Sequence, residues 1–229
     1  GLAVALLLAS CASSVEKVTE GTGPLQFQGY SIAPPSGPGW EMLRTADVAM
    51  FGKGTASGSH TFAATVVRHR NLDPASVGYA DYWSNPKVFA AYVKEAGERA
   101  NPPGSRNRII QHDVVADAGF GYCAREYLKS EDSGSPLAPH VLVQEDWGYS
   151  CLHPEDSRSI VQVVFSERGL PGESDPAAVE VREAFFAGFE FARPAPAAAS
   201  PAVGSPPVAA PTVDVLFVVK ESLRDGVRK

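Results

Sequence analysis

The sequence lacks an apolar run long enough to cross a membrane, and it lacks any cluster of basic residues. A transmembrane helix needs roughly 20 consecutive apolar residues, and the apolar run Leu2 to Leu8 near the N-terminus is far shorter. The formal net charge is -6, and no stretch of Lys and Arg occurs along the chain. Binding to nucleic acid relies on neutralising phosphates with basic side chains. Nucleic acid is therefore not an expected partner.

The familiar signatures of catalysis and of metal binding are also missing. The chain has no Gly-x-Ser-x-Gly elbow, no phosphate loop, no His-Glu-x-x-His and no Gly-x-Gly-x-x-Gly after a strand. It has no Cys-x-x-Cys pair, and His153 lies too close to Cys151 for the usual spacing of zinc ligands. We therefore assign no catalytic residue, no metal site and no cofactor from the sequence.

The residues that are present suffice for one sizeable hydrophobic core. Of 229 residues, 44% are hydrophobic, which fits a single domain better than two. The 19 Pro and 21 Gly are concentrated in a few segments, and these segments mark the boundaries of the domain. The expected organisation is a signal-peptide remnant (1–10), a lipidated tether (11–24), one domain (25–193), a disordered Pro/Ala-rich linker (194–211) and a tail (212–229). The tail is an extra edge strand, a segment of no function or a strand that binds a partner.

The N-terminus carries the strongest signal. The apolar run ends in Leu8-Ala9-Ser10-Cys11, which resembles the lipobox of bacterial lipoproteins and the end of a secretory signal peptide. The resemblance implies that Cys11 carries the lipid and that the domain lies outside the cytoplasm, in the cell envelope. Several acyl chains on one cysteine hold a protein stably at a membrane. The alternative is that Leu2 to Leu8 is a buried strand or helix and Cys11 an ordinary core residue.

Cys123 and Cys151 are the two cysteines that remain after Cys11. An even pair in an exported chain is typical of a disulfide, and both residues lie in segments that alternate between apolar and polar side chains. We therefore predict a disulfide between neighbouring strands, with the Cα atoms within about 7 Å. The alternative is two separate buried thiols.

The order of the expected elements indicates the α+β class. Short strands precede two consecutive helices between Pro74 and Arg99, each begun by an Asp-Pro or Asn-Pro pair. Alternating segments from Ile109 to Ser166 predict an antiparallel meander, and a last helix is expected from Asp175-Pro176 to near Arg193. Strands followed by helices, strands and a helix favour an antiparallel sheet flanked by helices.

An opening pattern adds a resemblance to a known fold. Gly29-Tyr30-Ser31-Ile32-Ala33-Pro34-Pro35 is followed by Trp40, by the strand Thr61 to Val67 and by the meander. This order resembles the PsbP/Mog1-like α/β/α sandwich over roughly Leu25 to Arg193. The resemblance implies an adaptor or assembly module more often than an enzyme, and it maps no partner-binding residue onto this chain.

Two histidines and a set of aromatic residues are the remaining candidates for a site. His112 precedes Asp113, and His153 begins His-Pro-Glu-Asp. Neighbours on a strand point to opposite faces, and His153 to Asp156 favours a turn with solvated acids. The aromatic side chains fit either the core or a ligand cleft; they are Tyr79, Tyr82, Trp83, Tyr92 and Trp147.

The leading hypothesis is a noncatalytic envelope lipoprotein whose domain binds a protein, or a small ligand, near the membrane to which its lipid attaches. The alternative is an envelope hydrolase with an unrecognised site at His112 or His153. An open cleft where one of these histidines meets a second polar group would favour the hydrolase.

Overall fold

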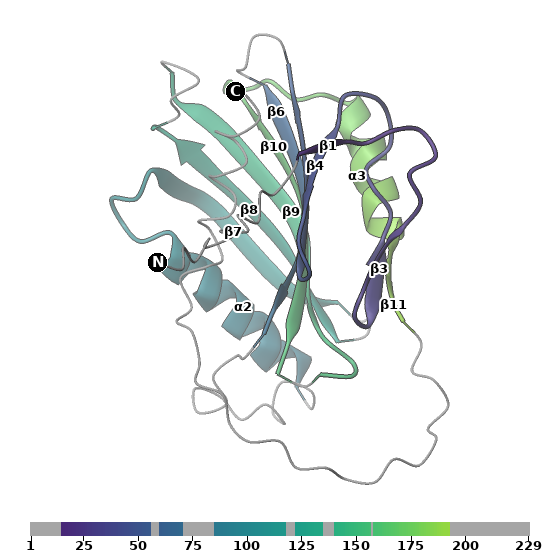
Figure 1. The fold of residues 1–229 in the computed structure, drawn as a ribbon. Coiled ribbons are helices and arrows are strands. Elements are labelled where there is room, and N and C mark those ends of the chain that lie inside the picture. The colour runs from purple at the N-terminus through teal and green to yellow at the C-terminus, as the bar shows by residue number, and fades with distance from the viewer. Residues whose placement is uncertain are drawn as a thin grey trace, which may run out of the picture.

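A computed structural model describes residues 15–55, 60–70, 85–117, 122–134, 140–156 and 158–192. These residues form three layers, with a large sheet in the middle, helix α2 on one face, and helix α3 with a small sheet on the other (Figure 1). The first of the two helices expected between Pro74 and Arg99 lies outside the described residues. The arrangement confirms an α+β protein with an antiparallel sheet and helices on both faces.

The large sheet has eight strands in the order β1-β4-β5-β6-β10-β9-β8-β7, and all neighbours are antiparallel. The strands are β1 (Glu16–Lys17), β4 (Glu41–Arg44), β5 (Val48–Gly54), β6 (Thr61–His69), β7 (Asn107–Asp117), β8 (Cys123–Asp132), β9 (Leu142–Leu152) and β10 (Ile160–Gly169). The long strands β7 to β10 are the meander that the alternating pattern predicted.

The small sheet has the order β11-β3-β2 and is built from β2 (Leu25–Phe27), β3 (Tyr30–Ile32) and β11 (Phe189–Phe191). Strands β2 and β3 form a hairpin, because Phe27 pairs with Tyr30 across a two-residue turn. Gly29 in this turn has a φ of 84°, which favours glycine. A Cβ at Gly29 would lie 2.4 Å from Nε2 of His153, so no other residue fits there without movement.

Helix α2 (Pro86–Ala100) begins where the Asn-Pro pair predicted. The side chain of Asn85 accepts a hydrogen bond from the amide of Lys87 at 3.2 Å, which is an ordinary N-cap. Phe89 and Val93 bury the inner side of the helix against Ala124, Leu152 and Ile160. The helix therefore covers the end of the sheet where β7 and β8 lie.

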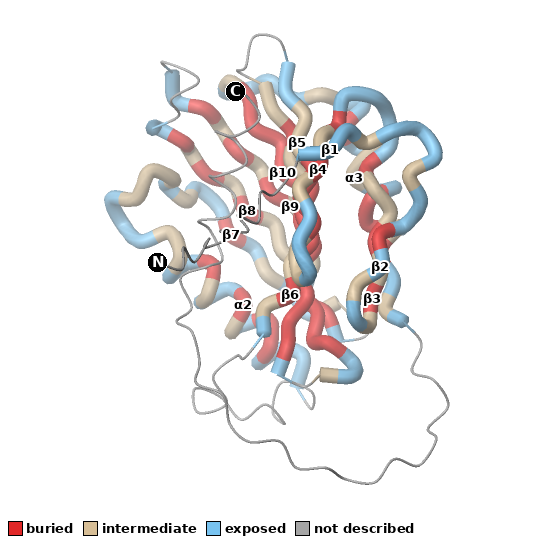
Figure 2. Tube along the Cα trace, viewed as in Figure 1, coloured by how far each residue is buried: buried red, intermediate tan, exposed pale blue. Residues whose placement is uncertain are grey.

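Helix α3 (Ala177–Ala187) packs on the opposite face with the small sheet. Phe185 contacts Phe51 with ring centroids 6.1 Å apart, and both side chains are 1% exposed. Trp40 packs against Phe165 and donates its indole N–H to the Ser36 carbonyl at 3.1 Å. This aromatic layer is the main hydrophobic core, and Figure 2 shows buried residues along the middle of the sheet.

Two boundaries differ from the sequence prediction. The last helix ends at Ala187 rather than near Arg193, and Phe189 to Phe191 pair with β3 as strand β11. Gly188 favours the break, since a Cβ there would lie 2.6 Å from the Cβ of Ala33. At the other end, regular structure begins before Leu25, because Glu16 and Lys17 pair with β4 inside the segment expected to be only a tether.

Candidate functional site

The predicted disulfide is present. Cys123 and Cys151 are directly opposite one another on β8 and β9, with Cα atoms 4.1 Å apart and an S–S distance of 2.07 Å. Both cysteines are buried, so the bridge belongs to the core and not to a reactive site. Cys11, the predicted site of lipidation, lies outside the described residues, and so does the tail 212–229.

His153 is a structural residue of the turn that follows β9. Its side chain is buried, and its Nδ1 accepts hydrogen bonds from the backbone amides of Glu155 and Asp156 at 3.2 and 3.0 Å. Its Nε2 lies 3.1 Å from the carbonyl oxygen of Gln28, which requires a proton on Nε2. Both ring nitrogens are therefore hydrogen-bonded to backbone groups and stabilise the predicted turn.

One acid of this turn is bound rather than solvated. Asp156 accepts hydrogen bonds from Ser159 and, at 2.8 Å, from Arg68, whose side chain is 3% exposed. Burial acts to raise the pKa of Asp156, but the hydrogen bonds from Ser159 and Arg68 outweigh it and lower the pKa. Arg68 also reaches the carbonyl oxygen of Gln28 at 3.3 Å. The cluster fastens the β2–β3 hairpin to the end of the large sheet.

His112 lies between β7 and helix α2, and it does not cooperate with Asp113. Its Nε2 is 2.9 Å from Oε1 of Glu126, and the side chain is only 2% exposed. A Cβ at Gly97 would lie 2.8 Å from its ring, so the helix packs directly over the imidazole. Asp113 points to the opposite face, as neighbours on a strand do. Neither histidine thus opens into a cleft, and this geometry does not favour the hydrolase hypothesis.

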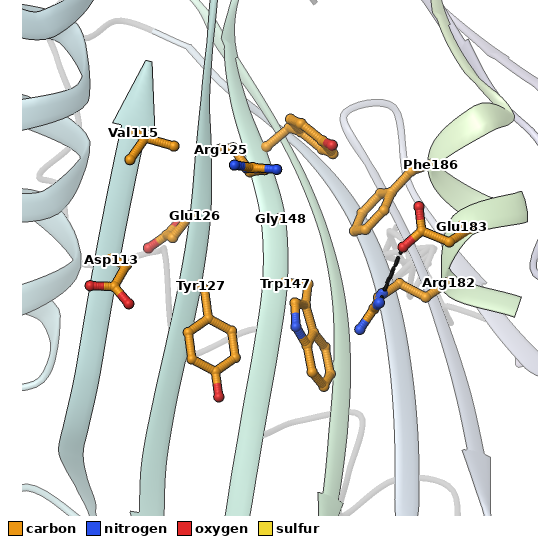
Figure 3. Close-up of a pocket in the computed structure, with 11 residues that line it drawn as sticks. Asp113, Val115, Arg125, Glu126, Tyr127, Trp147, Gly148, Arg182, Glu183 and Phe186 are labelled. Carbon is orange, nitrogen blue, oxygen red and sulfur yellow. Dashed lines mark hydrogen bonds and ion pairs between the residues drawn. The ribbon is translucent and has the colours of Figure 1, made fainter. Parts of the chain in front are cut away.

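An open groove with a volume of about 390 Å³ lies beside α3. Its floor is the part of the sheet that α3 leaves uncovered, and α3 forms one wall (Figure 3). Side chains from three neighbouring strands line the floor in register, since Asp113 pairs with Tyr127 and Tyr127 pairs with Trp147. The lining residues are Asp113, Val115, Arg125, Glu126, Tyr127, Trp147, Gly148, Tyr149, Arg182, Glu183 and Phe186. These residues together form the groove.

Aromatic and cationic side chains are combined in the groove. The guanidinium carbon of Arg182 lies 4.4 Å from the centroid of the Trp147 ring, within the range of a cation–π contact. Tyr127 and Trp147 are neighbours, with centroids 5.8 Å apart. Burial, followed by the nearby charge of Glu145, raises the pKa of Tyr127. A hydrogen bond between the Tyr127 hydroxyl and Glu145 acts in the same direction, so the tyrosine is neutral and its hydroxyl already has a partner.

The carboxylates of the groove already have partners. Glu183 accepts a hydrogen bond from Arg182 at 3.1 Å, and Asp113 accepts one from Gln111 at 2.5 Å. Glu126 is hydrogen-bonded to His112. The lining set contains no Ser, Cys or His. Within the described part of the chain, no cluster of three or more His, Cys, Asp or Glu could hold a metal ion. The carboxylates of the groove are therefore engaged in contacts within the chain itself.

Sequence reasoning found only part of this groove. Trp147 was a candidate for core or cleft, and it is half-buried at the groove floor. Tyr92 lies on α2 and is half-buried against the core beneath that helix, and Tyr79, Tyr82 and Trp83 lie outside the described residues. Arg125 and Arg182 were missed, because nothing in a linear pattern places a residue of α3 beside β8 and β9. The usable signal was the odd-numbered series on β8 and β9, which carries aromatic and charged side chains where a covered face would carry aliphatic ones.

No helix among the described residues has the length and apolar character to cross a bilayer. No known family model matches the sequence, and comparison with curated proteins gives no match.

Proposed function

We propose that the protein is a noncatalytic binding module of the bacterial cell envelope, held at the membrane by a lipid on Cys11, and that its groove contacts a protein partner. The observation that carries the proposal is the composition of the groove. Trp, Tyr and Arg are the residues most enriched at the energetic centres of protein interfaces, and Trp147, Tyr127, Arg125 and Arg182 lie together there.

The shape of the groove favours a macromolecule over a small ligand. Sites for small molecules usually enclose most of the ligand surface. This groove is open along the uncovered side of the sheet and continues to the outer strand β7. A protein surface can cover such a groove, whereas a small molecule would leave much of its own surface in water.

The disulfide supports a location outside the cytoplasm. Disulfides persist in oxidising compartments and are rare in the cytosol, and the Cys123–Cys151 bridge fits the exported chain that the lipobox-like sequence implies. The three-layer α+β arrangement, with Trp40 after the β2–β3 hairpin, supports a PsbP/Mog1-like domain as the module.

Photo-crosslinking in intact cells tests the groove. A photoreactive amino acid is placed at Val115 or at Tyr127, and the matched control carries it at Glu190, which is exposed on β11 of the small sheet. We expect one specific adduct from both groove positions and none from Glu190. Arg125→Ala and Trp147→Ala should each reduce the yield of the adduct by about tenfold, because truncating an energetically dominant interface residue weakens the binding free energy by over 1 kcal/mol. Adducts that are absent, or equal at all three positions, would contradict the proposal.

A separate experiment tests the anchor. The chain with its native leader should incorporate labelled fatty acid and partition into detergent, and Cys11→Ala should do neither. A Cys11→Ala protein that still carries the label and fractionates with membranes would contradict lipidation at this residue.

A further inference from the structure

Strand β7 ends the large sheet and leaves a long edge beside the groove. It has eleven residues, whereas β1 at the opposite end of the sheet has two. Within the described chain, no backbone hydrogen bond reaches the outer edge of Gln111 to Ala116. Proteins usually shield such edges, since unpaired N–H and C=O groups accept another strand. A bulge at Ile110 interrupts the start of β7, but the stretch from Gln111 to Asp117 pairs regularly with β8.

The side chains of Gln111 to Asp117 determine which residues an added strand needs for favourable contacts. On the groove face they are Gln111, Asp113, Val115 and Asp117, because these residues share a face with Tyr127 and Arg125 of β8. Val115 is 48% exposed, and an acid stands two residues away on either side. A strand paired here would therefore place an apolar side chain opposite Val115 and basic side chains opposite the two acids, since opposite charges across a strand pair are favourable.

A second copy of the same strand fits this edge less well. Antiparallel pairing centred on Asp113 would place the two Asp113 side chains opposite each other, and pairing centred on Val115 would place Asp113 opposite Asp117. Like charges directly opposite are destabilising. The acidic edge thus disfavours these symmetric pairings and favours a segment of opposite charge.

We propose that β7 is a docking strand to which an extended segment of the partner adds, with Lys or Arg opposite Asp113 and Asp117 and an apolar residue opposite Val115. This inference rests on the proposed function, because the same partner occupies the groove. The groove continues the face of the added strand, so the neighbouring side chains of the partner reach Tyr127 and Trp147. Strand addition supplies main-chain hydrogen bonds for affinity, and the alternating side chains supply specificity.

A synthetic peptide tests the edge without the natural partner. The probe is Ser-Lys-Thr-Val-Thr-Lys-Ser with blocked ends and a fluorescent label, and its anisotropy is followed as the full chain is added. We expect saturable binding, and binding about tenfold weaker when both Lys are replaced by Glu. Asp113→Lys should remove the preference between the two peptides, because each peptide then meets one opposite and one like charge. Glu190→Lys, which makes the same charge change on the small sheet, should leave the preference unchanged.

Peptides methylated at single backbone nitrogens separate strand addition from simple charge attraction. In an added strand, every second N–H faces β7. Methylation should therefore abolish binding at alternate positions and leave it within about twofold at the others. Uniform tolerance of methylation, equal binding of the Glu peptide, or a dimer that forms through β7 and excludes the peptide would each overturn the proposal.

The natural partner distinguishes this inference from the groove proposal. If Val115 and Tyr127 crosslink a partner whose capture is unaffected by Asp113→Lys and by excess Lys peptide, the groove function stands and strand addition is wrong. If the peptide binds with the alternating pattern but no groove adduct forms in cells, strand addition at β7 stands and the groove function is wrong.

Discussion

The sheet face that α3 covers has two halves that differ in what lies over them. The covered half includes β4, β5, β6 and β10, and the open half consists of β7, β8 and β9. One row of side chains crosses both halves in register: Phe165, Trp147, Tyr127 and Asp113. Phe165 is 1% exposed, Trp147 and Tyr127 are half-buried, and Asp113 is exposed. The same strand geometry thus serves the core at one end of the row and the surface at the other.

This difference indicates which half of the sheet face contributes to stability and which contributes to binding. In the covered half, aromatic and aliphatic side chains pack against Phe185 and Phe186 of α3, and burial of that kind dominates folding. In the open half, comparable side chains remain half-exposed, so their replacement removes little buried area. We therefore expect the covered half, together with the buried Cys123–Cys151 bridge, to control the free energy of unfolding, and the half-exposed side chains of the open half to control binding.

The largest effect should come from truncating the centre of the covered half. Phe185→Ala removes a ring that is 1% exposed and contacts Phe51, and such substitutions lower the free energy of unfolding by about 3–5 kcal/mol. Urea unfolding followed by circular dichroism measures the change. Tyr127→Ala in the open half is the matched control, and an equal loss in both variants would break the comparison.

Removing the disulfide should have the next largest effect. The bridge closes a loop with a sequence separation of 28, which contributes about 3.5 kcal/mol in the chain-entropy model. We expect the melting temperature of the Cys123→Ser, Cys151→Ser double variant to fall by roughly 10 °C. Free reaction of both cysteines with an alkylating reagent in folded, oxidised protein would instead show that the pairing is wrong.

Acid should destabilise the protein through His69 at the end of β6. Burial lowers the pKa of His69 to about 4, from 6.5 in an unfolded chain. Between pH 6.5 and 4 the unfolded state therefore binds more protons than the folded state, and stability falls as pH falls, by at most about 3 kcal/mol. Urea unfolding at pH 7 and at pH 4.5 should show a smaller loss in His69→Gln than in the parent. The control is His140→Gln, because His140 is exposed, and this variant should lose as much unfolding free energy at pH 4.5 as the parent does. If His69→Gln also loses as much as the parent, this mechanism is excluded.

Much of the fold could be predicted from the sequence, for local reasons. Alternation over ten or so residues located β7 to β10, and Asn85 marked the start of α2 by its capping geometry. The end of α3 could not be located in this way. Phe185, Phe186 and Phe189 fit helical spacing, and only the edge of β3 and the close contact of Gly188 with Ala33 make β11 a strand.

The groove was harder to predict, because its residues come from β7, β8, β9 and α3. Linear patterns indicate which side chains face a core, but they do not indicate how far a helix extends over a sheet. Tyr127 and Trp147 would be core residues if α3 lay one strand further across. The histidines are the opposite case. The sequence makes His112 and His153 candidates for a catalytic site, whereas in the fold both are buried and hydrogen-bonded.

The central claim, that the half-exposed side chains of the open half bind a partner and add little to stability, is tested most directly by two measurements on one variant. Tyr127→Ala is examined for its free energy of unfolding in urea and for its crosslinking yield from a photoreactive residue at Val115. We predict a change in unfolding free energy of less than about 1 kcal/mol, as expected for a half-exposed site, together with a loss of at least about tenfold in the specific adduct. A variant that is destabilised by several kcal/mol, or one that keeps the full yield of adduct, would contradict the claim.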